Sequence, residues 1–378
     1  MKTIYLDNAA TSFPKAEGVS NAVKDFLDRS CCNIGRGSYE RAQETGLTVF
    51  ETRERIAALF DCPSAKHVIF TGGMTAALNT VIKGFVRKGD RVLISSMEHN
   101  SVVRPLTQIG AEIVRIPAFE EGISDLSELK DDLSSFRLCI HTHASNVCGS
   151  LQPVVELGKR CKASGLPFVL DAAQTAGHFP FSMKELGLSA LCMPAHKGLL
   201  SAQGLGILCL DPAFAERLEP LIAGGTGSLS YSERIPDFYP DRFEAGTLNL
   251  PGIIGLYAAL KSADFEKNRE HELHLMTLFQ KHLSEIPDIR VCGTTDLAKR
   301  VAVYAIDFPT HDNAEVSNLL ETEYGILTRC GLHCAPDAHK SLGTYPKGSV
   351  RFSFSPATTD DEIRFAADAI RTTAQQNI

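Results

Sequence analysis

The sequence lacks the features of a membrane protein, a secreted protein and a nucleic-acid-binding protein. No apolar run approaches the roughly 20 residues that a helix needs to span a bilayer, and the first residues, MKTIYLDNAATSF, contain no apolar segment of signal-peptide length. The formal net charge of −7 comes without a basic stripe, which argues against a nucleic-acid surface. We therefore expect a cytoplasmic protein that binds neither nucleic acid nor a membrane.

Paired cysteines are also missing. The eleven cysteines form an odd set without a CxxC pair, which suits a reducing compartment and mostly inert buried thiols. Cys330, His333, Cys334 and His339 are close in sequence and are compatible with a metal site, but no second ligand pair has zinc-like spacing. We predict that no metal is bound.

The sequence does contain a regular alternation of apolar runs and helical patterns. Between the runs, MTAALNTVIKGF, DLSELKDDL and PVVELGKRCKASG have apolar residues at three-to-four-residue spacing, which predicts crossover helices. Strands that alternate with helices predict an α/β domain with a mainly parallel, seven-stranded sheet. The seven runs are HVIFT, RVLISS, AEIVRI, RLCIHTH, LPFVLD, SALCMP and LGILCL.

A second domain is predicted after the loop RFEAGTLNLPG. Residues 251–285 form one long helical pattern, and VAVYAIDF, GILTR and GSVRFSFS follow as strands of an α+β region. A chain of 378 residues also exceeds the size at which a single core usually suffices. We predict a large domain of residues 14–250 and a smaller domain of residues 1–13 and 251–378.

Polar residues end two of the predicted strands, at the edge where an open parallel sheet gathers its functional groups. FVLDAAQ places Asp171 at a strand end with Gln174 three residues later, and SALCMPAHK places His196 and Lys197 after another strand. On its own, Asp171 is more typical of a helix N-cap, and Lys197 of a solvated lysine beside a turn. A lysine that is partly dehydrated at a strand end is instead a nucleophile, because dehydration favours the neutral amine.

Three further motifs place polar groups at strand ends. FTGGMTAALN sets two glycines before a helix, with Met74 and Thr75 in its first turn, which predicts either a phosphate cradle or an ordinary tight turn. His99 follows RVLISS and suits stacking on a flat ligand, proton transfer or a structural role. Asn146 follows RLCIHTH, where a hydrogen-bonded turn is the alternative. A phosphate cradle, an acid, a lysine and a stacking histidine together indicate a pyridoxal phosphate (PLP) site.

These motifs resemble those of the class V aminotransferase family of fold-type I PLP enzymes, and within it the cysteine desulfurases and selenocysteine lyases. The single cysteine of GLHCAP is similar to that of the Suf-type subgroup. The resemblance spans nearly the whole chain and implies the PLP-dependent transferase fold and a homodimer. The motifs that carry it are YLDNAATSFP, EHN, SNVCG, the interval from DAAQ to HK, RFEAGT, TRCGLHCAP and GSVRFSFS.

The resemblance also implies a role for each site residue. Lys197 would hold the cofactor as a Schiff base, Asp171 would pair with its ring nitrogen, and Gln174 with its ring hydroxyl. The other implied roles are His99 stacked on the ring; Asn146 near the ring hydroxyl and the substrate; Met74, Thr75 and His196 on the phosphate, with Thr247 reaching across from the partner subunit; and Arg351 on the substrate α-carboxylate, with Arg329 near it.

The sequence departs from the family pattern around the phosphate. Pro194 stands where a serine is usual, and Met74 replaces the first of two threonines, so two hydroxyl donors are lost. Ser201 and Ala202 replace a Gly-Pro pair that often follows the lysine. These changes predict an altered cofactor affinity with the catalytic set retained.

The leading hypothesis is a PLP-dependent cysteine desulfurase that converts L-cysteine to L-alanine and passes sulfur, through a persulfide on Cys334, to an acceptor protein. Cys334 lies beside His333 and near Arg329 in a polar loop, a setting that favours a thiolate; a small buried hydrophobe is the commoner fate of a cysteine. The alternatives are a selenocysteine lyase that acts on L-selenocysteine and delivers selenium, an aminotransferase, and a non-catalytic cofactor-binding or sulfur-carrier scaffold.

Overall fold

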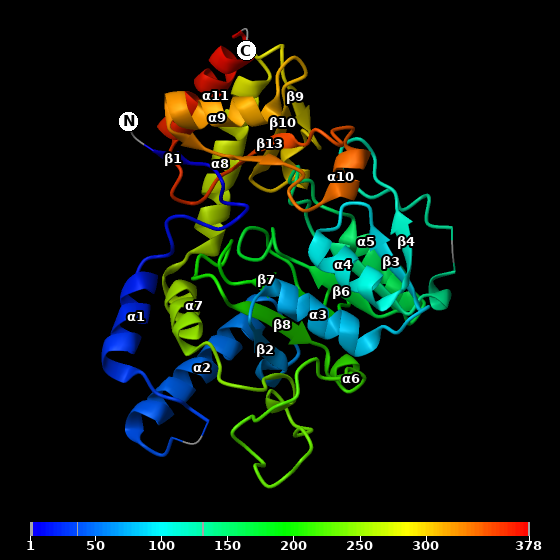
Figure 1. Cartoon of the computed structure of the whole chain (residues 1–378), viewed down its shortest axis with the longest axis vertical. Helices are drawn as coiled ribbons and strands as arrows, with labels where there is room; N and C mark the ends of the chain where they lie inside the picture. Colours follow the sequence, from blue (N-terminus) through cyan, green and yellow to red (C-terminus); the bar gives the residue numbers. More distant parts are fainter. Residues whose placement is uncertain (1–2, 36, 131, 377–378) are drawn as a thin grey trace.

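A seven-stranded sheet forms the centre of the larger part of the molecule (Figure 1). The structure, a computed structural model, describes residues 3–35, 37–130 and 132–376. The strand order is β2-β8-β7-β6-β5-β3-β4; β8 is antiparallel to both neighbours, and the other neighbouring pairs are parallel. The prediction of a mainly parallel sheet is thus confirmed. The strands are β2 Val68–Thr71, β3 Arg91–Ser95, β4 Glu112–Ile116, β5 Leu138–Thr142, β6 Phe168–Asp171, β7 Ala190–Pro194 and β8 Gly206–Leu210.

Helices cover both faces of this sheet. Neighbouring residues of one strand, such as Val169 and Leu170, belong to two different core clusters. Because both faces are buried, the central strands read as continuous apolar runs. One face packs on α2 Glu40–Leu59, α5 Val154–Ala163 and α7 Leu250–Ser262; the other packs on α3 Met74–Phe85, α4 Asn100–Ile109 and α6 Pro212–Ala215; α1 Val19–Asp25 lies against α7.

The predicted crossover helix DLSELKDDL is not formed in the described part of residues 125–133, whereas MTAALNTVIKGF and PVVELGKRCKASG correspond to α3 and α5. Short polar side chains bind the local backbone instead. The Ser127 amide donates to Asp125 Oδ1 at 2.9 Å, and the Ser134 amide donates to Asp132 Oδ1 at 3.0 Å. Such local hydrogen bonds compete with helix formation.

A smaller part of the molecule is built on an antiparallel sheet of order β12-β13-β10-β9. The N-terminal strand β1 (Ile4–Tyr5) packs into this part, because it pairs in parallel with β11 (Ile326–Leu327) (Figure 1). Ile4 and Leu6 are accordingly buried in the second core cluster. The other elements are β9 Arg290–Cys292, β10 Val303–Asp307, β12 Arg329–Gly331, β13 Ser349–Ser353, α8 Phe265–Leu283, α9 Asn313–Tyr324, α10 Pro336–Ser341 and α11 Asp360–Ala374.

The prediction of a single long helix over residues 251–285 is wrong, because the helix is interrupted between α7 and α8. Asp264 begins α8 as its N-cap and accepts a hydrogen bond from the Lys267 amide at 3.1 Å. Ile253 and Leu256 of α7 pack in the core of the large sheet, whereas α8 packs in the second core. The domain limits remain a prediction, and this packing favours a boundary at residues 263–264 over one at 251.

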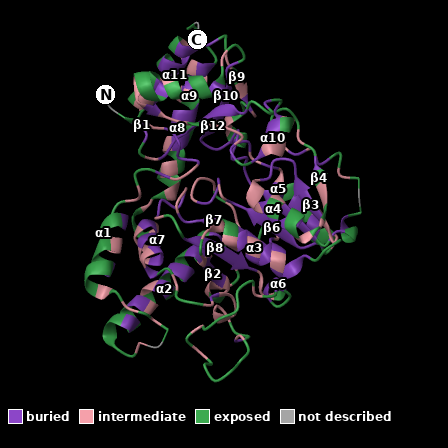
Figure 2. Cartoon of the chain, in the orientation of Figure 1, coloured by how far each residue is buried: buried purple, intermediate pink, exposed green. Residues whose placement is uncertain are grey.

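Burial is concentrated in the strands of both sheets, and exposed residues gather on α1 and on the irregular segment between α6 and α7 (Figure 2). Within the described ranges, no helix combines the length and apolar character that crossing a membrane requires.

Candidate active site

A cavity of about 510 Å³ brings the predicted site residues together, apart from Thr247. They come from the ends of the large sheet's strands and from the segments around β12 and β13 of the smaller sheet. The cavity therefore lies between the two sheets. The predicted residues that line it are Met74, Thr75, His99, Asn146, Asp171, Gln174, His196, Lys197, Arg329, Cys334 and Arg351.

Lys197 lies in a tight loop that follows β7. The Leu200 amide closes this loop on the Lys197 carbonyl at 2.8 Å. Gly198 lets the loop press against its neighbour, since an added Cβ would lie 2.2 Å from the Ala176 carbonyl oxygen. Burial lowers the pKa of Lys197 to about 8, and the charge of Arg351 acts in the same direction. A partly dehydrated amine, not a freely solvated one, therefore faces the cavity.

Asp171 ends β6, where its buried carboxylate points into the same cavity. Oδ1 accepts a hydrogen bond from the Ala173 amide at 2.9 Å, so the residue also shapes the turn after the strand. Burial raises the pKa of Asp171 to about 6, and nearby Lys197 opposes that shift. Gln174 lies in the following turn and donates from Nε2 to the Ala9 carbonyl at 3.1 Å. A buried carboxylate in this position is suited to a cationic N–H partner.

The turn between β2 and α3 has the geometry of an anion cradle. Gly73 has φ 130° and caps α3 without a side chain, so the first amides of a twelve-residue helix face outward. An added Cβ at Gly206 on β8 would lie 2.3 Å from the Gly73 carbonyl carbon, so the turn also needs a glycine opposite it. Thr75 Oγ1 lies 2.9 Å from Ser101 Oγ, which ties this turn to α4.

His99 is both a helix cap and a cavity residue. It is the N-cap of α4, and its Nδ1 accepts a hydrogen bond from the Ser101 amide at 3.0 Å. Burial lowers the pKa of His99 to about 4, so its ring is neutral at physiological pH. Because Nδ1 is the acceptor, the proton of the neutral ring lies on Nε2.

Cys334 lies in a strained turn between β12 and α10. His333 and Cys334 have φ of 48° and 58°, and the Ala335 amide closes the turn on the Leu332 carbonyl at 2.9 Å. Left-handed backbone costs a residue other than glycine roughly 1 to 2 kcal/mol. The Asn100 amide holds the turn by donating to the Cys334 carbonyl at 2.8 Å. The Cys334 side chain is exposed, which rules out the alternative of a small buried hydrophobe.

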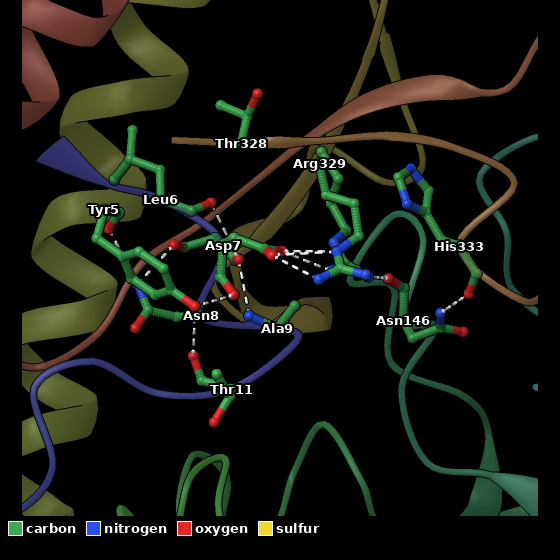
Figure 3. Close-up of polar contacts among 12 residues, drawn as sticks. Tyr5, Leu6, Asp7, Asn8, Ala9, Thr11, Asn146, Thr328, Arg329 and His333 are labelled. Atoms are coloured by element: carbon green, nitrogen blue, oxygen red, sulfur yellow. Dashed lines mark hydrogen bonds and ion pairs between the residues drawn. The ribbon is translucent and has the colours of Figure 1, made fainter. Parts of the chain in front are cut away.

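Asn146 and Arg351 support the same turn. Asn146 Nδ2 donates to the His333 carbonyl at 2.7 Å, as the close-up shows (Figure 3). Arg351 Nη1 donates to the Asn146 carbonyl at 3.0 Å, and Arg351 is only 3% exposed. His333 Nε2 lies 3.1 Å from the Ser349 carbonyl oxygen. In the described part of the chain, no three His, Cys, Asp or Glu side chains group as metal ligands.

Sequence reasoning missed several residues of this site. Ser101 links His99 to Thr75, and Thr11 Oγ1 lies 3.0 Å from His196 Nδ1. Thr11 belongs to the motif YLDNAATSFP, which indicates that this segment matters. The sequence did not show that Thr11 contacts His196. Asp7 contacts two cavity arginines, as shown below.

Thr247 lies outside the cavity of its own chain. It lines a second cavity, of about 800 Å³, together with Arg53 and Glu244. Those two side chains form a buried ion pair at 2.7 Å, and the Phe70 amide donates to Glu244 at 2.6 Å. Among the residues that the structure describes, Thr247 and Lys197 line different cavities.

The residues of the first cavity fit PLP. The outward amides of α3 suit a phosphate, the buried Asp171 suits a protonated ring nitrogen, and the dehydrated Lys197 suits an aldehyde. His99 supplies a neutral ring in the same cavity. The donor set thus matches the phosphate, the ring nitrogen and the aldehyde of the cofactor.

Comparison with known proteins identifies the family of the chain. The aminotransferase class-V family matches residues 4–365. A relative from Methanothermobacter thermautotrophicus, named "Probable cysteine desulfurase", is 30% identical over 97% of this chain and 94% of its own; one of the same name from Pyrococcus abyssi is 32% identical over 96% and 92%. The structure of a cysteine desulfurase from Thermococcus onnurineus NA1 is similar, with a TM-score of 0.89 at 29% identity over 98% and 94% of the two chains. The chain belongs to the aminotransferase class-V family and is a PLP-dependent enzyme with that family's fold.

Proposed function

We propose that this protein is a cysteine desulfurase, which converts L-cysteine to L-alanine and retains the sulfur as a persulfide on Cys334. The observation that carries the proposal is the exposed Cys334, held in a strained turn over the cavity that contains Lys197 and two arginines. A transaminase has no use for a thiol at this position. The names of the relatives agree with the proposal.

The first group of residues holds the cofactor. Asp171 would bind the ring nitrogen, Gln174 the ring hydroxyl, and the amides of Met74 and Thr75 the phosphate, with His196 beside them. PLP, when bound, supplies an electron sink for the electron pair released at the substrate Cα. Because Met74 and Pro194 carry no hydroxyl, we expect the phosphate to be held more by backbone amides than by side chains.

The second group acts on the substrate. The Lys197 amine is the base that takes the Cα proton, and its lowered pKa keeps it available near neutral pH. The Cys334 thiolate attacks the substrate sulfur; the carbon–sulfur bond breaks, and its electron pair remains with Cβ, which takes up a proton. The atoms balance as L-cysteine plus thiol giving L-alanine plus persulfide. Arg351, with Arg329 and Asn146, holds the substrate carboxylate, and the neutral His99 ring lies against the reacting groups.

A homodimer completes the site in this proposal. Thr247 lines a separate cavity of its own chain, so it suits a role in which Thr247 of the partner subunit reaches the phosphate. Exposed apolar side chains that are close in sequence to residues lining the second cavity support a contact between subunits. They are Leu47, Phe50, Ile222, Leu229 and Tyr231. We expect light scattering to show a dimer. Thr247→Ala should weaken PLP binding without dissociating the dimer.

The sulfur leaves through an acceptor protein that takes the exposed persulfide. All eleven cysteines are free thiols, which supports a reducing compartment such as the cytoplasm. Selenocysteine lyase activity is a variant of the same chemistry, because a selenol leaves more readily than a thiol.

One experiment tests the function. Purified holoenzyme is incubated separately with L-cysteine, L-selenocysteine, and L-alanine plus α-keto acids, and both products of each reaction are identified. We expect L-alanine and a protein persulfide from L-cysteine. Selenide production without a persulfide would favour a lyase, and a new amino acid from the keto acid would favour a transaminase. Lys197→Ala is the inactive control.

A further inference from the structure

Asp7 lies directly behind the two arginines of the cavity without lining the cavity itself. It follows β1 and pairs with Ser353 at the end of β13. The segment is fixed on both sides, since Asn8 Nδ2 donates to the Ser353 carbonyl at 3.0 Å and the Ala9 amide donates to Ser353 Oγ at 2.8 Å. The carboxylate is therefore held by backbone that has little freedom to move.

The two arginines occupy paired positions on neighbouring strands. Arg329 of β12 lies directly opposite Arg351 of β13 in the antiparallel register. Like charges in such a pair destabilise a sheet. The Asp7 carboxylate bridges them. Oδ1 accepts from Arg351 Nη2 at 2.9 Å. Oδ2 accepts from Arg329 Nε and Nη2 at 3.0 and 2.9 Å, and Figure 3 shows Asp7 beside Arg329. One carboxylate thus leaves a net charge of +1 on the cluster.

The bridge also fixes the direction of Arg351. Its guanidinium is held by Asp7 through Nη2 and by the Asn146 carbonyl through Nη1, while the buried Nε has no hydrogen-bond partner among the described residues. A guanidinium has five N–H groups, and these two contacts use only two of them. Arg351 lines the cavity, so the other N–H groups of its side chain remain for a ligand. The arrangement presents a planar, pre-oriented donor to an incoming carboxylate.

We propose that Asp7 is the positioning residue for the substrate α-carboxylate, which orients Arg351 and sets the net charge of the two-arginine cluster to match a single carboxylate. This inference rests on the proposed amino-acid substrate. Asp7 acts through the arginines and does not touch the reacting atoms. Its loss therefore weakens recognition of the carboxylate more than it slows the chemistry.

A purely structural role for Asp7 is the competing explanation, and the chain offers a matched control. Asp307 on β10 of the same sheet has the same side-chain exposure, 12%, and also binds two cations: it lies 3.3 Å from Arg290 and 3.2 Å from Lys347. None of these three residues lines the cavity. Asp307→Asn therefore reproduces the loss of a buried two-cation bridge away from the substrate.

The test measures equilibrium binding to holoenzyme, through the change in cofactor absorbance, of L-alanine and of L-alaninamide, which lacks the carboxylate. We expect Asp7→Asn to weaken L-alanine binding at least tenfold, which is the loss expected for one charge-assisted contact. Alaninamide binding should change less than about twofold. Asp307→Asn leaves both affinities within about twofold. Equal losses for both ligands in Asp7→Asn, or no loss, would overturn the proposal.

Steady-state kinetics with L-cysteine supply a second readout. Asp7→Asn should raise KM about tenfold or more with kcat within about threefold, which is the signature of lost substrate binding. Asp7→Glu keeps the charge and should bind L-alanine more tightly than Asp7→Asn; if Asp7→Asn fails to fold, Asp7→Glu and Asp7→Ser replace it in the same comparison. A wild-type protein that prefers L-alanine to alaninamide but does not act on L-cysteine would refute the proposed desulfurase activity and leave the Asp7 inference standing.

Discussion

The two sides of the cavity are built in different ways. On the side of the large sheet, Asp171 and Lys197 follow directly from strand ends, and local backbone contacts fix them. On the other side, Arg351 is held by Asp7, which is 344 residues away in sequence, and Cys334 by a strained turn. The large-sheet side holds Asp171 and Lys197, which in the proposed function bind the cofactor and must stay in one position. The other side places groups that must meet and release a substrate.

The difference extends to electrostatics. Burial shifts the pKa values of Lys197, Asp171 and His99 toward their neutral forms, to about 8, about 6 and about 4. On the substrate side, the hydrogen bond to Asp7 raises the pKa of Arg329; burial lowers the pKa of Arg351, but Asp7 opposes that shift. Burial thus weakens the charged forms on the cofactor side, whereas on the substrate side the Asp7 counter-ion favours the charged arginines. Predictions can separate the two sides.

The largest effect is expected on the cofactor side. Lys197→Ala removes the amine that binds the cofactor aldehyde and takes the Cα proton, so activity should be abolished. Borohydride reduction followed by mass spectrometry should find no lysine-linked cofactor. The control is Lys15→Ala, because burial also lowers the pKa of Lys15 to about 8 although it lies outside the cavity. A reducible adduct in Lys197→Ala, or its loss in Lys15→Ala, would reassign the lysine.

Asp171→Asn should slow turnover by about 10² to 10³-fold, the scale of losing one preorganised electrostatic group. The ligand-free protein should keep its melting temperature, because burial already disfavours the charged carboxylate that the substitution removes. Turnover is measured as L-alanine formed from L-cysteine, and melting by circular dichroism without cofactor. Near-normal turnover would show that the ring nitrogen is held by another group.

The same division explains how much the sequence could predict. Asp171, His99 and Lys197 follow apolar strand patterns, so their meeting at one sheet edge followed from topology alone. The bridge from Asp7 to Arg329 and Arg351 joins the first residues of the chain to the last strands, and no local pattern encodes such a pairing. The absent helix near residue 125 and the break before α8 were missed for a related reason: single side chains, Asp125 and Asp264, override apolar periodicity.

Cys334→Ala should retain the bound cofactor and lose the persulfide, with L-cysteine turnover reduced by about ten- to a hundredfold. Selenocysteine turnover should fall less, because selenol is a better leaving group. The matched control is Cys330→Ala on adjacent β12: burial raises the pKa of Cys330, which disfavours its thiolate. Alkylation and peptide mass spectrometry locate the persulfide. Finding it on Cys330, with Cys334→Ala fully active, would exchange the two assignments.

The smallest expected effect is the pH dependence of a reaction of Lys197 on the cofactor side. Covalent capture of PLP by the cofactor-free protein requires the neutral Lys197 amine, whose pKa is lowered to about 8. Below that pKa the amine is protonated and capture is slow; as pH rises through it the neutral fraction increases and then levels off. The capture rate should therefore rise about tenfold from pH 7 to 9 and reach a plateau, whereas an ordinary lysine, with a pKa near 10.4, would give about a hundredfold rise without a plateau. Stopped-flow absorbance at constant ionic strength measures the rate. Asp7→Asn removes a negative charge that raises the pKa of Lys197, so the profile should move toward lower pH in that variant, and an unmoved profile would mean that the charge of Asp7 does not reach Lys197.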